Sequence, residues 1–474
     1  MAMNDVLKRR IVSAFAPSLL VLSLSACGNS PPPALPPELV AARSWLLVSD
    51  IHFNPFDDPN LVSRLVADPA VSWHLILSKS SRPPSPYFSD TNFALLESAL
   101  SAMQANVRNP PVVVIAGDFL GHNFPAQFAK FEPSAPPSLY TGFVDKTIKF
   151  LALEFNAAYP QAQFVITLGN NDGYCGDYMS TPDSPFLAHM ATAWLPLVNR
   201  NATAPNFVHD FSTGGYYTSS LPAQAAVPAV VTNSVFWSAS YQDSCGMPSS
   251  DPGSTELDWL ASTLSSEGPA RPLLLTHIPP GIDEYASIKN NAATPLYKEA
   301  YTQRFLGILA QNGVDPRAFI LGHIHHATFE LTPTGGGQLP AFVVPSISPN
   351  QGNNPAFMTA LIDPKSSTIS DTRTFFLQLA PLGLGWAQLY TFTAAYSLPG
   401  FDTESFQTLQ NSIAASPLVR GQFFNFYNSA SPVATPAPGK WQWYWCGHTN
   451  LTPTPYSACV SSHVARRAQS ASEQ

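Results

Sequence analysis

The chain has 474 residues, a formal net charge of −8 at pH 7 and 45% hydrophobic residues. A chain of this length can bury one large core or two smaller ones. The acidic balance argues against a broad basic face, so binding to a nucleic-acid duplex is not expected. Only 11% of the residues are charged and 47 are proline, a composition typical of a loop-rich exported domain.

The first 27 residues have the pattern of a bacterial export signal. Lys8-Arg9-Arg10 precedes an apolar stretch that ends in Leu24-Ser25-Ala26-Cys27, which resembles a lipobox. Residues 1–27 are therefore predicted to be a signal peptide with lipid attachment at Cys27, and residues 28–43 a proline-rich tether. We expect an exported, membrane-tethered lipoprotein in the periplasm or at the cell surface. A plain signal peptide or a membrane anchor is the alternative, although the apolar stretch is short for a membrane span.

Residues 44–363 alternate between strand-like apolar runs and helical patterns, which predicts an α/β (α+β) domain with a mixed pair of sheets covered by helices. Helices are predicted over residues 92–107, 144–158, 256–264 and 295–312. Strands are predicted over residues 45–48, 112–116, 164–168, 207–217, 229–237, 273–275, 319–321 and 341–344.

The remaining chain is predicted to form a smaller, mainly helical C-terminal subdomain over residues 364–465, followed by a disordered tail over residues 466–474. Short strands are predicted over residues 372–377 and 389–396, and helices over residues 406–414 and 420–427. This part of the chain carries no obvious catalytic set.

Four cysteines remain when Cys27 is set aside, an even number that suits disulfides in an oxidising compartment. None has the Cys-x-x-Cys spacing of a metal or redox site. Three pairings are open, and proximity in the sequence favours Cys446 with Cys459, which leaves Cys175 with Cys245.

Five short segments place metal-binding side chains at predicted strand ends. They are Asp50-Ile51-His52, Gly117-Asp118, Gly169-Asn170-Asn171-Asp172, Thr276-His277 and Gly322-His323-Ile324-His325. One such segment alone is weak evidence, because Asp-x-His or His-x-His often occurs in a surface turn. All five together are hard to obtain by chance, and in open α/β folds functional groups collect beyond the carboxyl ends of strands.

The spacing of Asp50 and His52 predicts that both face one metal while Ile51 points into the core. The same alternation predicts that His323 and His325 share a face, with Ile324 buried between them. The alternative interpretation is a structural one-metal site at the His-x-His pair, with Asp50 and His277 capping turns.

The donor types indicate the metal and the chemistry. Asp118 supplies a carboxylate that can bridge two cations, Asn170 an amide oxygen and His277 an imidazole. A set rich in imidazole suits Zn, Fe or Mn rather than Ca or Mg. Two cations about 3.5–4 Å apart can clamp a phosphoryl oxygen and hold a hydroxide for in-line attack.

These segments resemble the calcineurin-like metallophosphoesterase superfamily, whose pattern is D-x-H, G-D, G-N-H-D/E, H and G-H-x-H. The resemblance implies a four-layer αββα sandwich and two divalent metal ions, with Zn the first choice and Mn or Fe as alternatives. It implies one metal site formed by Asp50, His52, Asp118 and His325. It implies a second formed by Asp118, Asn170, His277 and His323, with Asp118 bridging the two.

Further residues resemble the acid sphingomyelinase-like and endopolyphosphatase-like branch: His122, four residues after Asp118, and the segments Gly214-Gly215-Tyr216-Tyr217 and Pro345-Ser346-Ile347-Ser348-Pro349. Gly121 stands where purple acid phosphatases carry a tyrosine ligand, which excludes an Fe(III)-tyrosinate centre. The resemblance implies a monomeric hydrolase of phosphoester or phosphoanhydride bonds. Its substrate would be a phosphorylated small molecule, polyphosphate or a lipid head group.

One residue departs from the family pattern. Asn171 replaces the histidine thought to protonate the leaving oxygen, and an amide cannot act as a general acid near neutral pH. Either His122 donates the proton, or the leaving group departs without help, as a phosphoanhydride or nucleotide substrate allows. A catalytically inactive lipoprotein binding module on the same fold is the alternative function. Asp172 is expected to orient loops rather than bind metal.

Overall fold

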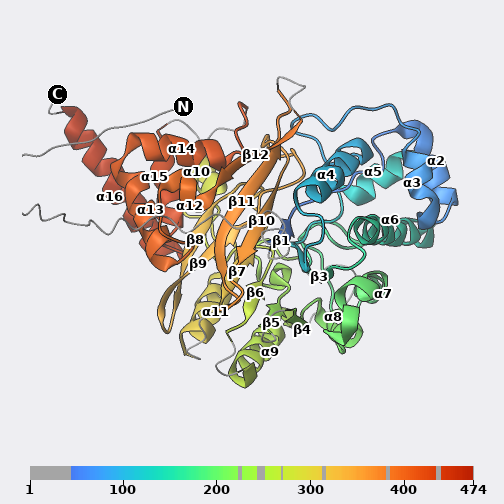
Figure 1. Cartoon of the computed structure of the whole chain (residues 1–474), viewed down its shortest axis with the longest axis horizontal. Coiled ribbons are helices and arrows are strands. Elements are labelled where there is room, and N and C mark those ends of the chain that lie inside the picture. The colour runs from blue at the N-terminus through green and yellow to red at the C-terminus, as the bar shows by residue number, and fades with distance from the viewer. Residues whose placement is uncertain are drawn as a thin grey trace, which may run out of the picture. The chain divides into compact units, whose positions relative to one another are not determined.

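Two six-stranded sheets contain the strands that precede the five polar segments (Figure 1). The computed structural model describes residues 44–222, 227–242, 251–267, 271–311, 316–380, 385–433 and 439–472. The first sheet has the order β12-β11-β10-β1-β2-β3. Its strands are β1 (Ser44–Val48), β2 (Val112–Ile115), β3 (Gln163–Ile166), β10 (Ala356–Ile362), β11 (Ile369–Leu377) and β12 (Trp386–Thr391). Strands β1, β2 and β3 are parallel, whereas β10, β11 and β12 pair antiparallel.

The second sheet has the order β4-β5-β6-β7-β9-β8. Its strands are β4 (Tyr217–Leu221), β5 (Val227–Val231), β6 (Leu273–Leu275), β7 (Ala318–Leu321), β8 (Phe329–Thr334) and β9 (Gly337–Val343). The four central strands β5, β6, β7 and β9 are parallel, and β4 and β8 flank them antiparallel. Both sheets are therefore mixed, as predicted.

The second sheet buries both of its faces, which explains its uninterrupted apolar runs. In β6, Leu273 and Leu275 pack in the large core shared with the first sheet. The intervening Leu274 packs in a separate core with helices α9 (Pro252–Glu267) and α11 (Glu299–Gln311). Strands that alternate between two apolar environments need hydrophobic residues at every position.

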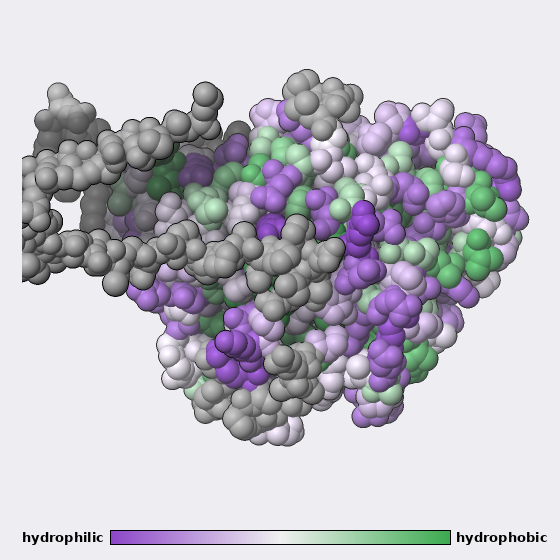
Figure 2. All heavy atoms as spheres, viewed as in Figure 1, coloured by the Kyte–Doolittle hydropathy of each residue, from purple (hydrophilic) through white to green (hydrophobic). Residues whose placement is uncertain are grey.

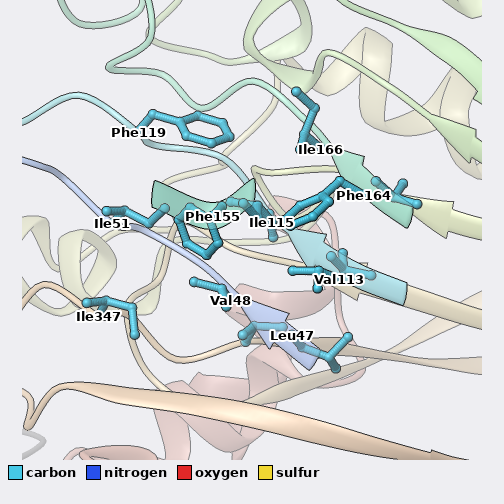
Figure 3. Packing of buried hydrophobic residues seen from close by; sticks show 14 of the residues in the cluster. Leu47, Val48, Ile51, Val113, Ile115, Phe119, Phe155, Phe164, Ile166 and Ile347 are labelled. Atoms are coloured by element: carbon cyan, nitrogen blue, oxygen red, sulfur yellow. The ribbon is translucent and has the colours of Figure 1, made fainter. Parts of the chain in front are cut away.

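Helices also cover the outer side of the first sheet (Figure 1). They include α2 (Pro59–Ala67), α3 (Trp73–Leu77), α4 (Phe93–Asn106), α5 (Phe124–Phe131), α6 (Pro137–Ala158) and α7 (Pro185–Val198). In α6, buried Ile148, Leu151 and Phe155 recur at helical spacing and pack on the sheet. Figure 3 shows Phe155 beside Ile115 and Phe164 of the strands. The α/β/β/α layering that the resemblance implies is confirmed.

The C-terminal part contributes strands as well as helices. The predicted boundary after residue 363 falls in the turn between β10 and β11, and β11 and β12 extend the first sheet. The helices that follow are α12 (Phe392–Tyr396), α13 (Thr403–Ala415), α14 (Pro417–Tyr427), α15 (Trp441–Gly447) and α16 (Pro453–Ser472). The predicted disulfide between Cys446 and Cys459 joins α15 to α16. Helix α16 extends through Ser472, whereas disorder was predicted from residue 466.

Three predicted strands are wrong in part. Residues 207–214 form helix α8 (Phe207–Gly214), because Phe207 and Phe211 share one buried face, and Gly215 ends the helix at φ +78°. After β5 the chain forms a 3₁₀ turn (Ser234–Trp237), which the Asn233 side chain caps by accepting a hydrogen bond from the Val235 amide. Strand β12 ends at Thr391, where helix α12 begins.

The predicted signal peptide and tether, with Cys27, lie outside the described residues, as does Cys245. The pairing of Cys245 with Cys175 therefore stays a prediction. None of the described helices combines the length and the apolar composition that crossing a bilayer requires. On the face shown in Figure 2, hydrophilic and hydrophobic residues are interspersed.

Glu330 on β8 is a buried acid with no compensating charge among the described residues. The residue is 7% exposed, and its Oε2 atom has no hydrogen-bond partner among the described residues. Burial raises the pKa of Glu330 from 4.5 to about 8. The folded state therefore favours the protonated form, whereas the unfolded chain ionises near pH 4.5.

We expect the contribution of Glu330 to the free energy of unfolding to fall as pH rises from 4.5 to 8, by up to about 1.4 kcal/mol per pH unit. Glu330→Gln keeps the side-chain volume and removes this loss. The Tm advantage of the variant over the wild type, measured by calorimetry, should grow between pH 5 and pH 8. The exposed Glu299→Gln should show no such trend, and parallel Tm profiles for wild type and Glu330→Gln would refute the assignment.

Candidate metal centre

All five polar segments leave the carboxyl ends of parallel strands, three in the first sheet and two in the second. They follow β1, β2 and β3, and β6 and β7. Backbone hydrogen bonds join neighbouring segments, from the Asp50 amide to the Gly117 carbonyl (3.1 Å) and from the Gly322 amide to the His277 carbonyl (2.9 Å). The sheets thus set the positions of the segments relative to one another.

Three of these segments have left-handed rather than extended backbone at the residues that carry the candidate ligands. Positive φ angles, from 43° to 72°, occur at Asp50, His52, Asp118, His323 and His325. Such angles are sterically costly for residues other than glycine and cluster at functional sites. Ile51 is fully buried as predicted, but Ile324 is only partly buried and lines a cleft. The predicted side chains do lie close together, but the extended backbone on which that prediction rested is wrong.

The carboxylate of Asp118 lies between two sets of ligand atoms. Its Oδ2 atom is 3.3 Å from His52 Nε2 and 3.4 Å from His277 Nε2. Asp118 forms one group with Asp50 and His52 and another with His277 and His323, and within each group the ligand atoms lie within 4.8 Å of one another. This is the arrangement expected of a bridging carboxylate.

Asp50 and His325 complete the first group. His325 Nε2 lies 3.1 Å from His52 Nε2 and 3.5 Å from Asp50 Oδ1. The other Asp50 oxygen, Oδ2, accepts hydrogen bonds from Ser49 Oγ (2.5 Å) and the His323 amide (3.1 Å). Asp50 Oδ1 is buried with no hydrogen-bond partner among the described residues. A buried carboxylate oxygen that faces imidazole nitrogens fits a cation ligand.

Hydrogen bonds outside the centre fix the tautomers of two histidines. His52 Nδ1 donates to the Leu120 carbonyl (3.1 Å), and His277 Nδ1 donates to the Ala116 carbonyl (2.6 Å). Both rings therefore present Nε2 to Asp118, as metal-binding histidines usually do through such outer partners. The Ala116 bond also ties a histidine of the second sheet to the end of β2 in the first.

The pKa values of the imidazoles around Asp118 are shifted in opposite directions. Burial lowers the pKa of His52 to about 4 and that of His323 to about 3, so both rings are neutral near pH 7. The Asp118 carboxylate outweighs burial at His277 and raises the pKa of that ring to about 9. The pKa of Asp118 lies well below its usual value, because His277 and His52 outweigh the opposing effect of burial. Imidazole nitrogens and carboxylate oxygens thus converge around one buried carboxylate. Their number and chemical type fit the binding of divalent cations.

Asn170 presents its amide oxygen toward the second group. Asn170 Oδ1 lies 3.1 Å from His277 Nε2, while Asn170 Nδ2 donates to Asp177 Oδ1 (2.5 Å). Since a carboxylate can only accept, Asp177 fixes which end of the amide faces the centre. Asp177 was not predicted from the sequence, because it lies in a loop with no motif.

Asn171 and Asp172 hold the loop that carries Asp118. The Asn171 amide donates to Asp118 Oδ1 (2.8 Å), and Asn171 Nδ2 donates to Asp118 Oδ2 (3.0 Å). Asp172 accepts hydrogen bonds from the amides of Phe119, Leu120 and Gly169, so it orients loops as expected. A Cβ atom at Gly169 would lie 2.0 Å from Asp118 Oδ1, which explains the glycine before Asn170.

His122 stacks on His52, with ring centroids 4.1 Å apart and an interplanar angle of 21°. The Asp90 carboxylate accepts two hydrogen bonds from His122, one from Nδ1 (2.7 Å) and one from the backbone amide (2.7 Å). These contacts with Asp90 outweigh burial and raise the pKa of His122. Asp90 was not predicted, because its segment before α4 has the composition of a helix-capping loop.

An open cleft of about 690 Å³ lies over the centre. Its lining includes Asp118, His122, Asn170, Asn171, His323 and His325 of the predicted set. Asp177, Asp283 and Glu284 add further acidic groups, and no lysine or arginine is among the described lining residues. The cleft can thus admit a substrate to the centre, and its described lining residues offer a polyanion no cationic side chain.

The model of the calcineurin-like phosphoesterase family matches residues 45–327, which include all seven predicted metal ligands. The chain is 25% identical to acid sphingomyelinase-like phosphodiesterase 3b of Mus musculus, over 82% of this chain and 83% of the relative. It is 24% identical to sphingomyelinase phosphodiesterase D of Dictyostelium discoideum, over 74% and 77%. It is 22% identical to the cyclic GMP-AMP phosphodiesterase SMPDL3A of Mus musculus, over 96% and 100%.

The contact between Asp177 and Asn170 predicts a loss of metal affinity on substitution. Asp177→Ala frees the Asn170 amide to rotate and should weaken the binding of a cation at the group of Asp118, His277 and His323 by about 10- to 100-fold, the usual effect of removing such a partner. Titration calorimetry of metal-depleted protein with Zn²⁺ measures this directly. Asp258→Ala, at an exposed carboxylate on α9, serves as the control. Unchanged affinity in Asp177→Ala would exclude the positioning role.

Proposed function

The chain belongs to the calcineurin-like phosphoesterase family and is a hydrolase of phosphoester bonds, and we propose that it cleaves phosphodiesters at a centre of two divalent metal ions. Asp50, His52, Asp118 and His325 would hold one ion, and Asp118, Asn170, His277 and His323 the other. The shared position of Asp118 Oδ2 between His52 and His277 is the observation that carries this assignment. The imidazole-rich donor set favours Zn, with Mn and Fe as alternatives.

Two bound cations would stabilise the negative charge that develops on the phosphoryl oxygens and lower the pKa of an attacking water. The chain itself supplies the positions of the ligands and the proton for the leaving group. With His122 Nδ1 engaged by Asp90, Nε2 is the ring nitrogen that can deliver a proton to the leaving oxygen. Asn171 donates two hydrogen bonds to Asp118 and so acts as a positioning residue rather than as an acid.

The composition of the cleft favours a substrate with a single phosphodiester group. A polyphosphate chain or a nucleoside triphosphate carries several negative charges, which proteins usually neutralise with lysine, arginine or additional cations. The described cleft lining has acidic residues and no lysine or arginine. The three relatives named above are all described as phosphodiesterases, which supports cleavage of a phosphodiester but does not bear on how many such groups the substrate carries.

We further propose that the protein is exported and tethered through Cys27. The signal-like first 27 residues support this location. The disulfide between Cys446 and Cys459 supports it as well, because structural disulfides persist in oxidising compartments.

Replacing Asp118 by asparagine keeps the shape of the side chain but removes the bridging charge. We expect Asp118→Asn to lower the hydrolysis of bis-p-nitrophenyl phosphate by at least about 100-fold and to reduce the bound metal, because the ligand shared by both ions is weakened. Elemental analysis and thermal unfolding, with Asp258→Asn as the control, separate metal loss from misfolding. Full turnover by a chelator-treated, metal-free sample would disprove the proposal.

The role of His122 predicts a dependence on the leaving group. A general acid matters most when the leaving oxygen is basic, so His122→Ala should slow methyl phenyl phosphate about 10- to 100-fold more than methyl p-nitrophenyl phosphate. Asp90→Asn should give the same pattern with a smaller difference. Steady-state kinetics on the two substrates decide the matter, since equal losses would assign His122 a purely structural role.

A further inference from the structure

The mouth of the cleft carries exposed apolar side chains. The described residues leave seven large hydrophobic side chains exposed, and three of them line this one cleft. These are Phe88 (64% exposed), Tyr285 (71%) and Val433 (46%). They come from the loop before α4, from helix α10 (Glu284–Asn290) and from the segment after α14. Exposed apolar groups that gather at a cleft mark a binding surface.

Phe88 is held in place by its loop. Its φ angle is +64°, an unfavourable value for a bulky residue, and its amide donates to the Pro349 carbonyl (2.9 Å). The neighbouring Tyr87 hydroxyl donates to Asn354 Oδ1 (2.6 Å). Asp90, two residues later, binds His122, so the loop that exposes Phe88 also positions the proposed proton donor. Phe88 therefore lines the cleft from the same loop that orients His122.

Tyr285 is fixed equally firmly on another element. It is the second residue of α10, and the side chain of the preceding Asp283 caps this helix by accepting a hydrogen bond from the Ala286 amide (2.7 Å). Further aromatic rings line the cleft beyond it. Tyr427 and Tyr444 are buried with ring centroids 5.5 Å apart, and His326 stacks on Tyr427 at 4.5 Å.

Charge limits what these rings can bind. Asp177, Asp283 and Glu284 line the same cleft, and the described lining offers no lysine or arginine to balance them. A substituent with an additional negative charge would meet the carboxyl groups of Asp177 and Asp283 and no cationic side chain of the described lining, whereas an uncharged flat ring would meet aromatic faces and edges.

We propose that Phe88 and Tyr285 form a binding site for a planar, uncharged aromatic group that the phosphodiester substrate carries. This inference rests on the proposed phosphodiesterase function and assigns the two residues the role of determining specificity. The rings at the mouth bind the organic group, while the centre below binds the phosphoryl group.

The test measures the binding of alkyl methylphosphonates, which keep one negative charge and one ester group but have poor leaving groups. The metal-loaded enzyme is titrated by calorimetry with the ethyl, cyclohexylmethyl, benzyl and 4-carboxybenzyl esters. We expect the benzyl ester to bind about 10-fold more tightly than the ethyl ester, as one aromatic contact provides. The cyclohexylmethyl and 4-carboxybenzyl esters should bind more weakly than the benzyl ester, because they lack a flat ring or add a charge.

Phe88→Ala and Tyr285→Ala should each reduce the ratio of ethyl to benzyl Kd by about fivefold, whereas Leu75→Ala should not change it. Leu75 is 70% exposed on α3 and is not among the residues that line the cleft. Leu75→Ala is therefore a control that also removes an exposed apolar side chain, but away from the cleft. Each variant is judged by the ratio of its ethyl to its benzyl Kd. Partial loss of metal or of folded protein affects both esters alike, so it does not change this ratio.

Several results would overturn the inference: equal binding of the ethyl and benzyl esters, ratios unchanged in both variants, or a cyclohexylmethyl ester that binds as tightly as the benzyl ester. Tighter binding of a hexadecyl ester than of the benzyl ester would also overturn it, in favour of a lipid chain. Hydrolysis of bis-p-nitrophenyl phosphate is measured in parallel. Turnover without benzyl preference refutes only this inference, whereas absence of turnover refutes the proposed function itself.

Discussion

The shared carboxylate of Asp118 is the interaction on which the rest of the site depends. One oxygen atom lies within 3.4 Å of histidines from both sheets, so this side chain joins the two halves of the fold at one point. A buried carboxylate is costly unless positive charge accompanies it. The fold tolerates that cost, together with left-handed backbone at five ligand positions, because strands with fully buried side chains hold each segment.

Two kinds of group orient the side chains of the centre: backbone carbonyls and side chains from loops. The backbone carbonyls of Ala116 and Leu120 orient His277 and His52, respectively. Both carbonyls belong to the segment that follows β2. Side chains from loops supply the remainder, since Asp177 orients Asn170 and Asp90 orients His122. The loop that contains Asp90 also exposes Phe88, so proton donation and recognition of the organic group are linked through one short segment.

The convergence of the seven proposed ligands was predictable from local sequence patterns, whereas the layered fold followed from the resemblance to a known family. Each ligand follows an apolar run within a few residues, and the parallel strands bring the five runs to common edges. The supporting residues were not predictable, because Asp90 lies 32 residues from His122 and the two meet only in the folded chain. The same reason explains the error at residues 207–214, where burial of Phe207 and Phe211 on one face decides between helix and strand.

The most direct test of the two-metal account is anomalous diffraction from crystals of the zinc-loaded protein at the zinc absorption edge. The account predicts two peaks on either side of the Asp118 carboxylate, one near Asp50 and His325 and the other near Asn170 and His323. A single peak, or peaks that Asp118 does not contact, would contradict it.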